Sequence, residues 1–315
     1  MTALEQIDLV RIAEDRAIGL AGERRIGLGC MALTGIYGAV GREQAVATLA
    51  AALDNGVTLF DTAPLYGNGA NETLLGDVLG GRPDTHIVTK FGLYADAAGS
   101  LYRDSRPETI RQSVEASLRR LKRDRIDLLL QHRTDPETPV DEVQACIEDL
   151  ISAGKVGEFG ISSVSAGQIA GWPMAPTLGA VQNELSMVTG QKIEEVAAAM
   201  TRGACFMAFS PLGRGILTGS KPSQPGDLRT SMLAFVQRST IGCTYGDGSG
   251  VDTEVGELAS ARRALAWVLA QGANVVAIPG CRSPSQVSVI FDDLDGSSAV
   301  HASKIQDKIA QNDSN

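Results

Sequence analysis

Side chains that can exchange protons recur in the first half of the chain, where buried strands are expected to end. Asp61 follows a short apolar run, and Tyr66 lies in the loop after it. Lys90 ends the run Val-Thr-Lys, and His132 ends the run Leu-Leu-Gln-His. Adjacent strands lie roughly 4.8 Å apart, so the ends of successive strands can bring these side chains into one small volume.

This set suits proton transfer to a carbonyl oxygen. A phenol has a reference pKa near ~10, and a neighbouring ammonium such as that of Lys90 lowers it. A buried ammonium needs a carboxylate partner, which Asp61 on the neighbouring strand can provide. His132 can donate a hydrogen bond that orients and polarises a substrate oxygen. We therefore expect Tyr66 to protonate a carbonyl oxygen while hydride arrives at the carbon.

Each of these side chains also has a simpler structural explanation. Asp61 can cap a turn, Tyr66 can pack its ring in a loop, and His132 can be a hydrogen-bonded core histidine. Lys90 is harder to explain in this way, because lysine is rarely buried unless it is paired. A strand-end lysine in a barrel can also attack a carbonyl as a Schiff-base nucleophile, so a lyase that uses Lys90 is an alternative.

Short apolar or β-branched runs alternate with amphipathic stretches, which is the pattern of repeated strand–helix units. The runs predict eight strands, at residues 26–30, 58–61, 87–90, 126–131, 159–162, 180–184, 205–209 and 275–278. Eight such strands close a barrel, so we predict an α/β fold, a (β/α)8 TIM barrel formed by residues 1–315 as a single domain. A hairpin within residues 9–20 is expected at the barrel floor, and helices are expected at the C-terminal end.

Local signals place two of the helices. Ser105 with Glu108 three residues later is the pattern of a capping box, and residues 110, 114, 118 and 121 then fall on one apolar face. Thr138 followed by Pro139 predicts a second helix start. Its apolar stripe falls at residues 143, 147, 150 and 151, and Gly154 is the expected stop.

Residues 219–255 do not follow the alternation of strand and helix patterns. They contain clusters of Ser, Pro, Gly and Asp at 221–227 and 245–251. A long segment without periodicity inside a compact domain is usually functional or disordered. We interpret it as an atypical long loop between the seventh strand and its helix, lying over the mouth of the barrel. A linker to a second domain is the alternative, although little chain follows it.

Composition disfavours several classes of partner. The net charge is −9 and the isoelectric point is near 4.9, so the average surface of the protein would repel nucleic acid and anionic membranes. Five scattered cysteines without Cys/His clustering predict reduced, mostly buried thiols and no metal site. No run of ~18 apolar residues and no leader pattern is found, so we expect a soluble, cytoplasmic protein. Nothing in the pattern predicts an oligomeric state.

One block of the sequence resembles the signature of the aldo-keto reductase family: residues 56–67 read GVTLFDTAPLYG, followed by Asn71, Glu72 and Leu-Leu-Gly. Later blocks resemble that family in the same order, namely LLQHR, GKVGEFGIS, VQNE, SPLGRGILTG and IPGCRS. The resemblance runs from residue 26 to residue 293. It is closest in pattern to the bacterial pyridoxal-reductase-like and potassium-channel β-subunit-like branches. It implies a catalytic tetrad of Asp61, Tyr66, Lys90 and His132, with tyrosine as the proton donor.

The resemblance also implies that NADP(H) binds without a glycine-rich dinucleotide fingerprint, and none opens a strand–helix unit here. The matching residues are Ser162 and Gln182 at the nicotinamide carboxamide, Phe209 against its ring, Ser210, Leu212, Gly213 and Arg214 at the diphosphate, and Gly280, Arg282 and Gln286 at the adenosine end. A guanidinium suits a 2′-phosphate, which favours NADP over NAD. The alternative for Arg282 is a solvated surface charge.

The activity implied is the reversible, NADPH-dependent reduction of an aldehyde or ketone, that is, an oxidoreductase acting on a small carbonyl substrate. Some relatives of this family, the potassium-channel β subunits, act as partners of another protein, so a cofactor-sensing regulatory subunit is a further alternative. The substrate itself is not readable from the loops. The aromatic residues considered as lining its pocket are Tyr37, Phe91, Tyr94 and Trp172.

Three positions depart from the family pattern. Phe209 stands where tyrosine is common, Ser163 where asparagine is frequent, and Ile290 where an asparagine often lies near the adenine. The first change keeps an aromatic face, whereas the other two each replace an asparagine that the family pattern places near the carboxamide or the adenine. Residues 228–255 do not resemble the family's usual helix before the eighth strand, so we expect an altered contact with the cofactor there.

Overall fold

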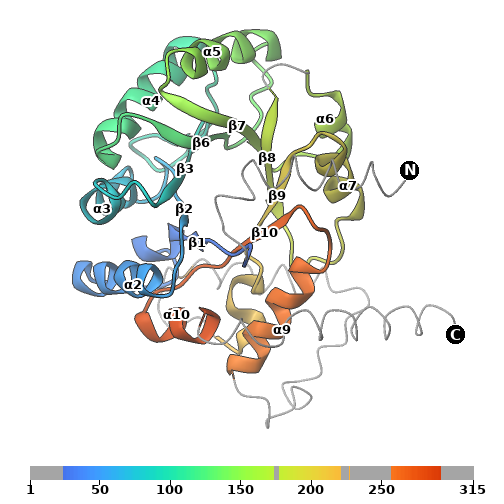
Figure 1. Ribbon diagram of the computed structural model, residues 1–315. Helices are drawn as coiled ribbons and strands as arrows, with labels where there is room; N and C mark the ends of the chain where they lie inside the picture. Colours follow the sequence, from blue (N-terminus) through green and yellow to red (C-terminus); the bar gives the residue numbers. More distant parts are fainter. Residues whose placement is uncertain (1–23, 174–176, 221–226, 228–256, 292–315) are drawn as a thin grey trace, which may run out of the picture.

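The computed structural model describes residues 24–173, 177–220, 227 and 257–291. Eight parallel strands form one sheet in the order β1-β2-β3-β6-β7-β8-β9-β10. In Figure 1 these strands surround the centre of the molecule and the helices lie outside them. Their bounds are β1 (Leu28–Gly29), β2 (Leu59–Asp61), β3 (His86–Phe91), β6 (Ile126–Gln131), β7 (Val156–Ser162), β8 (Leu178–Glu184), β9 (Cys205–Phe209) and β10 (Val275–Ile278).

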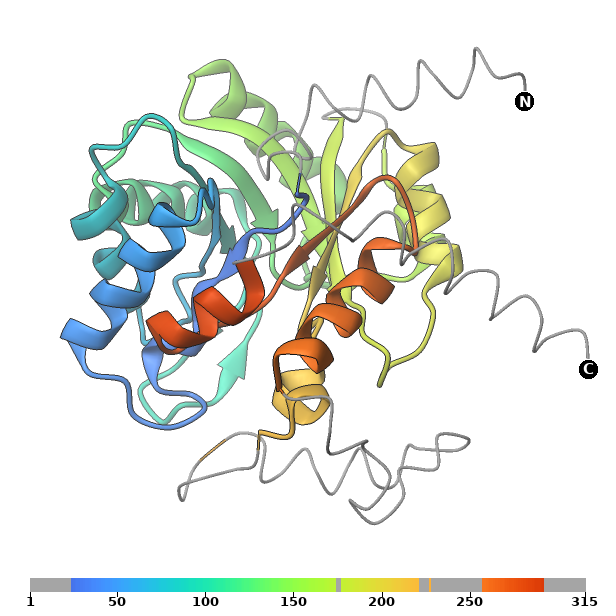
Figure 2. The same ribbon diagram turned by 60° about the horizontal axis from the view of Figure 1, so that its bottom comes forward.

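The sheet closes on itself between β10 and the segment that leads into β1. Ile26 forms a parallel bridge with Ala277. The Gly27 amide donates to the Ala277 carbonyl at 2.9 Å, and the Gly29 amide donates to the Pro279 carbonyl at 2.9 Å. Figure 2 shows the first and last strands side by side. The predicted (β/α)8 barrel is therefore confirmed, including all eight strands, although β1 is shorter than expected.

A helix follows each strand on the outside of the barrel, as the alternating pattern predicts (Figure 1). The helix after β10 packs against the helix after β1, so the ring of helices closes together with the sheet. The helices are α2 (Arg42–Asp54), α3 (Ala70–Leu79), α4 (Pro107–Leu121), α5 (Val140–Ser152), α6 (Ala166–Gly171), α7 (Ile193–Thr201), α9 (Glu257–Leu269) and α10 (Pro284–Phe291). Smaller elements are the 3-10 helices η2 (Cys30–Thr34) and η3 (Gly213–Thr218) and a hairpin of β4 (Tyr94–Ala95) and β5 (Leu101–Tyr102).

Two apolar cores hold the barrel together. Side chains alternate across each strand, so every second residue points inward and the others pack beneath the helices. The inner core is small and fills the barrel with Leu59, Val88, Leu128, Leu130, Ala180, Cys205, Met207, Val276 and Ile278. The larger core lies between strands and helices and includes Phe60, Phe159 and Phe206. The barrel interior is thus packed, and a ligand can enter only at an end.

The start of α4 differs from the prediction. This helix begins at Pro107 and no side chain caps it. Ser105 is fully buried, and its Oγ accepts a hydrogen bond from Gln131 Nε2 at 2.9 Å. The predicted capping box of Ser105 and Glu108 is therefore wrong, because the Ser105 hydroxyl ties the preceding loop to β6. The predicted apolar face is confirmed, since Ile110, Val114, Leu118 and Leu121 are all buried.

Helix α5 follows the prediction more closely. It begins at Val140 with Pro139 at its N-cap, and Gly154 just beyond its end has a positive φ of 72°. Such a backbone suits glycine, as expected for a helix stop. Thr138 Oγ1 donates to Asp135 at 2.7 Å, so it braces the turn before the helix.

Several predictions fall outside the described residues, namely the hairpin within residues 9–20, almost all of the 219–255 segment, Cys243 and any helix beyond residue 291. Within the described ranges, Cys30, Cys146, Cys205 and Cys281 are free thiols and buried, as predicted. Among these residues, no helix combines the length and apolar character needed to cross a membrane.

Candidate active site

The alternation of side chains carries the polar residues of the site to one end of the barrel. An inward apolar residue of the inner core is followed two residues later by a polar side chain on several strands. Because the period of a strand is two, these polar side chains lie directly above the packed interior. The pairs are Leu59 and Asp61, Val88 and Lys90, Leu130 and His132, and Ala180 and Gln182.

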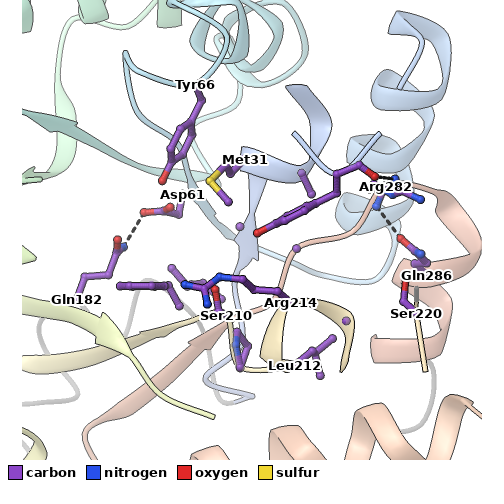
Figure 3. A pocket seen from close by; sticks show the side chains of 18 of the residues that line it. Met31, Asp61, Tyr66, Gln182, Ser210, Leu212, Arg214, Ser220, Arg282 and Gln286 are labelled. Carbon is purple, nitrogen blue, oxygen red and sulfur yellow. Dashed lines mark hydrogen bonds between the residues drawn. The ribbon is translucent and has the colours of Figure 1, made fainter. Parts of the chain in front are cut away.

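A cavity of about 450 Å³ opens at this carboxyl end of the strands. Most of the predicted site residues line it: Asp61, Tyr66, His132, Ser162, Gln182, Phe209, Ser210, Leu212, Arg214, Gly280, Arg282 and Gln286. Lys90 and Gly213 are not part of its lining. Figure 3 shows Tyr66 and Asp61 on one side of the cavity and Arg282 on the opposite side.

Asp61 and Lys90 form a buried ion pair beneath the cavity. Lys90 Nζ lies 2.8 Å from each carboxylate oxygen of Asp61 and donates to the Thr62 carbonyl at 2.8 Å. The two side chains are only 1% and 5% exposed. Burial lowers the pKa of Lys90, but Asp61 and Tyr66 raise it, and the net direction is upward. The ammonium is therefore held in its charged form, as expected from the sequence.

Tyr66 places its hydroxyl above this pair. Its Oη lies 3.4 Å from Lys90 Nζ, and its ring meets the His132 ring edge to face at 6.0 Å between centroids. Burial raises the pKa of Tyr66, while the Lys90 ammonium acts in the opposite direction. The net rise is opposite to the lowering expected from the sequence, because the removal of water from the phenol outweighs the nearby positive charge. The phenol is thus a protonated acid at neutral pH.

His132 is a neutral imidazole at the edge of the cavity. It is 7% exposed, and burial, Lys90 and Arg133 together hold its pKa well below 6.5. A neutral ring carries one N–H and can donate it to an oxygen in the cavity. The geometry therefore permits the predicted hydrogen bond from His132 to a substrate oxygen.

Ser162 and Gln182 pair in register at the ends of β7 and β8. Gln182 Nε2 donates to Asp61 Oδ2 at 2.7 Å, which fixes its orientation and joins it to the ion pair (Figure 3). The Ser162 hydroxyl is 1% exposed and has no hydrogen-bond partner among the described residues. A buried hydroxyl without a hydrogen-bond partner costs free energy, so an amide group of a ligand beside Ser162 would supply the missing hydrogen bond. These two residues therefore fit the carboxamide of a nicotinamide.

The segment after β9 has an unusual backbone. Ser210, Gly213 and Arg214 all have positive φ, between 52° and 57°. A Cβ on Gly213 would meet Val188 at 2.8 Å, so only glycine fits there without rearrangement. Arg214 Nη2 lies 2.8 Å from Glu184 Oε2, an ion pair that was not foreseen. Arg214 is thus held at the cavity wall by a carboxylate, in addition to the diphosphate contact that the resemblance implies.

The end of β10 forms the other end of the cavity. The Arg282 amide donates to Gln286 Oε1 at 2.8 Å, and the Arg282 guanidinium donates to the Tyr37 carbonyl. No carboxylate pairs with Arg282 among the described residues. Figure 3 shows Arg282 and Gln286 on the side of the cavity away from Tyr66. Because the guanidinium is half-buried and lacks an anion, it fits a phosphate group at this end.

The aromatic predictions were less accurate. Of the four candidates for the substrate pocket, only Tyr37 lines the cavity. Phe91 and Trp172 are buried and both pack on Phe159, while Tyr94 pairs with Tyr102 in the β4–β5 hairpin. Those three predictions are wrong, because sequence position alone does not separate a core aromatic from one at the mouth.

Sequence reasoning also missed several lining residues, among them Met31, Leu93, Leu101 and Arg133. Arg133 could have been found, because it follows His132 directly and a half-buried arginine at a strand end needs a partner. The apolar residues carry no such signal, since their neighbours in the sequence are ordinary.

Comparison with known proteins decides the family. The model of the aldo/keto reductase family matches residues 25–295, which is most of the chain. The chain belongs to this family. The probable aldo-keto reductase 1 of Glycine max is 34% identical over 267 residues, covering 81% of this chain and 76% of that protein. The aldo-keto reductase yakc of Schizosaccharomyces pombe, whose name includes NADP(+), is 31% identical over 85% of this chain and 82% of that one.

A solved structure gives the same result at the level of the fold. The glycerol dehydrogenase from Gluconobacter oxydans has a TM-score of 0.76 and 32% identity, covering 90% of each chain. The resemblance to aldo-keto reductases that the sequence blocks carry is therefore confirmed, and the protein is an oxidoreductase.

Proposed function

We propose that this aldo/keto reductase reduces an aldehyde or ketone to the alcohol with NADPH, reversibly, and that Tyr66 is the proton donor. The observation that carries the proposal is the position of the Tyr66 hydroxyl, which reaches the cavity directly above the Lys90–Asp61 pair. Burial keeps this phenol protonated, and a proton donor for reduction must carry its proton at working pH.

The other residues assist the same step. When bound, NADPH supplies the hydride. His132, as a neutral imidazole, would donate a hydrogen bond to the carbonyl oxygen beside Tyr66. Lys90 would stabilise the phenolate left after proton transfer, and Asp61 keeps Lys90 charged. A positive charge already in place at the developing anion requires no reorganisation during the reaction.

The cofactor assignment rests on both ends of the cavity and on a relative. Ser162 and Gln182 would bind the carboxamide, Phe209 would pack on the ring, and Arg282 would bind a 2′-phosphate. The intermediate residues Ser210, Leu212, Gly213 and Arg214 would contact the diphosphate, with Gly280 and Gln286 at the adenosine. The NADP(+) in the name of the relative from Schizosaccharomyces pombe supports the same choice.

The lyase alternative is not favoured by the geometry. A Schiff-base lysine must be uncharged and reach the substrate. Lys90 is 1% exposed, does not line the cavity, and has a raised pKa because of Asp61 and Tyr66 despite burial. The regulatory alternative predicts cofactor binding without turnover, so a turnover assay separates it from the reductase.

Titration of the protein with NADPH and NADH, followed by nicotinamide fluorescence, tests the cofactor proposal. Wild type should bind NADPH more tightly than NADH. Arg282→Ser should weaken NADPH binding by roughly 10- to 100-fold, the effect of losing hydrogen bonds to a charged group, and leave NADH binding within about twofold. Arg111→Ser is the matched control, because Arg111 is an exposed residue on α4 paired with Asp149.

Oxidation of NADPH by a panel of aldehydes and ketones then tests the reaction. Binding without turnover of any carbonyl compound would favour the regulatory alternative. A protein that binds neither dinucleotide would refute the proposed function.

A further inference from the structure

Arg133 is a charged residue of the cavity to which no part of the proposed reaction gives a role. It follows His132 in the loop after β6 and is half-buried at the cavity wall. Its positive charge acts on Tyr66 and His132, the two groups that would surround the carbonyl oxygen. Because the guanidinium also donates to the backbone carbonyl of His132, it lies beside that residue, at the end of the cavity where reduction would occur.

The other charged groups of the wall already have roles. Asp61 is paired with Lys90, and Arg214 is paired with Glu184. Arg282 has no carboxylate among the described residues, and it is the residue proposed to bind the cofactor phosphate. Arg133 has no carboxylate partner in the described part of the chain either. Its Nη1 donates instead to the neutral backbone carbonyl of His132 at 2.6 Å.

Two acidic residues that could pair with Arg133, Asp135 and Asp104, accept hydrogen bonds from other donors instead. Asp135 accepts from the Ser105 amide at 2.8 Å and from Thr138 Oγ1 at 2.7 Å. Asp104 accepts from Arg106 Nη2 at 2.6 Å. A second positive charge, Arg103, lies nearby: it directly follows the β4–β5 hairpin and donates to the carbonyl of Thr134, the residue after Arg133, at 3.3 Å. In a chain of net charge −9, this end of the cavity is locally positive.

Apolar side chains make up another part of the cavity wall. Met31, Leu65, Leu93 and Leu101 line the same cavity. An apolar wall with one guanidinium suits a short carbon chain that ends in an anion. The planar guanidinium donates two parallel hydrogen bonds to a carboxylate, which gives orientation as well as affinity.

We propose that Arg133 binds a carboxylate on the carbonyl substrate, so that the preferred substrates are short aldehyde or keto acids. This inference rests on the proposed reductase function. Binding at Arg133 would hold the substrate at one end while the carbonyl lies between Tyr66 and His132. No covalent step is involved, and the contribution is to affinity and orientation.

The test compares substrates that differ only in the anionic group. Succinic semialdehyde, its methyl ester and butanal are assayed with NADPH, using wild type, Arg133→Gln, Arg133→Lys and Arg103→Gln. Arg103→Gln is the matched control, because it removes an exposed charge of the same sign that does not line the cavity. The affinity of each variant for NADPH is measured alongside, to show that the cofactor site is intact.

Wild type should prefer succinic semialdehyde over the other two. Arg133→Gln should lose on the order of 10- to 100-fold in kcat/KM for the acid, mainly through KM, and change less than about twofold for butanal. Arg133→Lys should recover part of the loss, whereas Arg103→Gln should stay within about threefold of wild type.

Three results would overturn the inference. If wild type reduces butanal as well as the acid, no anion site exists, although the proposed function stands. If Arg133→Gln loses activity equally on all three compounds, Arg133 acts by positioning His132 through its backbone and does not bind substrate. If no carbonyl compound is reduced at all, the proposed function fails, and this inference fails with it.

Discussion

At the scale of single residues, the ion pair of Asp61 and Lys90 is the part of the site that was easiest to predict. Asp61, Lys90 and His132 end strands, so their convergence follows from the spacing of strands. The direction of the Tyr66 pKa was harder, because it depends on how much water the folded chain removes from the phenol. The ion pair between Arg214 and Glu184 was not predictable either, since Arg214 lies beyond the end of β9, in η3, where the irregular backbone and not the strand spacing decides what its side chain reaches.

The buried pair itself should show strong energetic coupling. Asp61→Asn or Lys90→Met alone leaves one uncompensated charge and should reduce the free energy of unfolding by about 3–5 kcal/mol. The double variant should lose clearly less unfolding free energy than the two single variants together, because it removes both charges. Urea unfolding of the four proteins measures this, with the exposed pair Arg111–Asp149 as a control whose coupling should be about 0–1 kcal/mol. Additive losses at Asp61 and Lys90 would contradict the pairing.

His132 predicts a pH dependence of stability. Its folded-state pKa lies well below 6.5 because of burial, Lys90 and Arg133, so the unfolded chain binds a proton more readily than the folded one. The stability contributed by the neutral ring is present above the unfolded pKa and is lost as pH falls toward the folded pKa. Between about pH 7 and about pH 5, wild type should therefore lose more stability than His132→Gln. Parallel pH profiles for the two proteins would show that the ring is not held neutral.

At the scale of elements, the strands were predictable and the details of the helix ends were not. Strand runs are short and apolar, and their period of two determines which residues face the cavity. The Ser105 capping box failed because the same serine also fits a buried hydrogen bond to Gln131, and local pattern cannot separate the two. The bounds of β7 and β8 extended further toward the N-terminus than the predicted runs, since Gly157 and Gly179 dilute the apolar signal there.

Helices α3 and α4 approach each other so closely that one glycine should be irreplaceable. A Cβ on Gly76 would lie 2.1 Å from the Arg120 carbonyl oxygen, which is backbone and cannot rotate away. Alanine improves helix propensity by about 1 kcal/mol, but the clash should outweigh this and give a net loss of about 1–3 kcal/mol. Gly81→Ala serves as control, because nothing lies within 4 Å of its Cβ. Thermal unfolding showing Gly76→Ala as stable as Gly81→Ala would refute the close packing.

At the scale of the whole molecule, the number of strands predicted the barrel, and the resemblance of six sequence blocks predicted the family. Closure of the barrel was the least certain part of the prediction, because β1 has only two residues. The ring closes through hydrogen bonds that the Gly27 and Gly29 amides donate. The cavity then lies at the carboxyl ends of the strands, as in other barrels of this kind. The positive side chains of Arg133 and Arg282 line this cavity, and the overall net charge of −9 gives no indication of them.

The most direct test of the account is the rate of NADPH oxidation by an aldehyde that wild type reduces, measured for Tyr66→Phe with the NADPH affinity of both proteins. Phenylalanine keeps the ring but has no proton to donate, so kcat should fall by about 10²- to 10⁴-fold while NADPH affinity stays within about twofold. Retention of most of the turnover in Tyr66→Phe would contradict the account, because another group would then supply the proton.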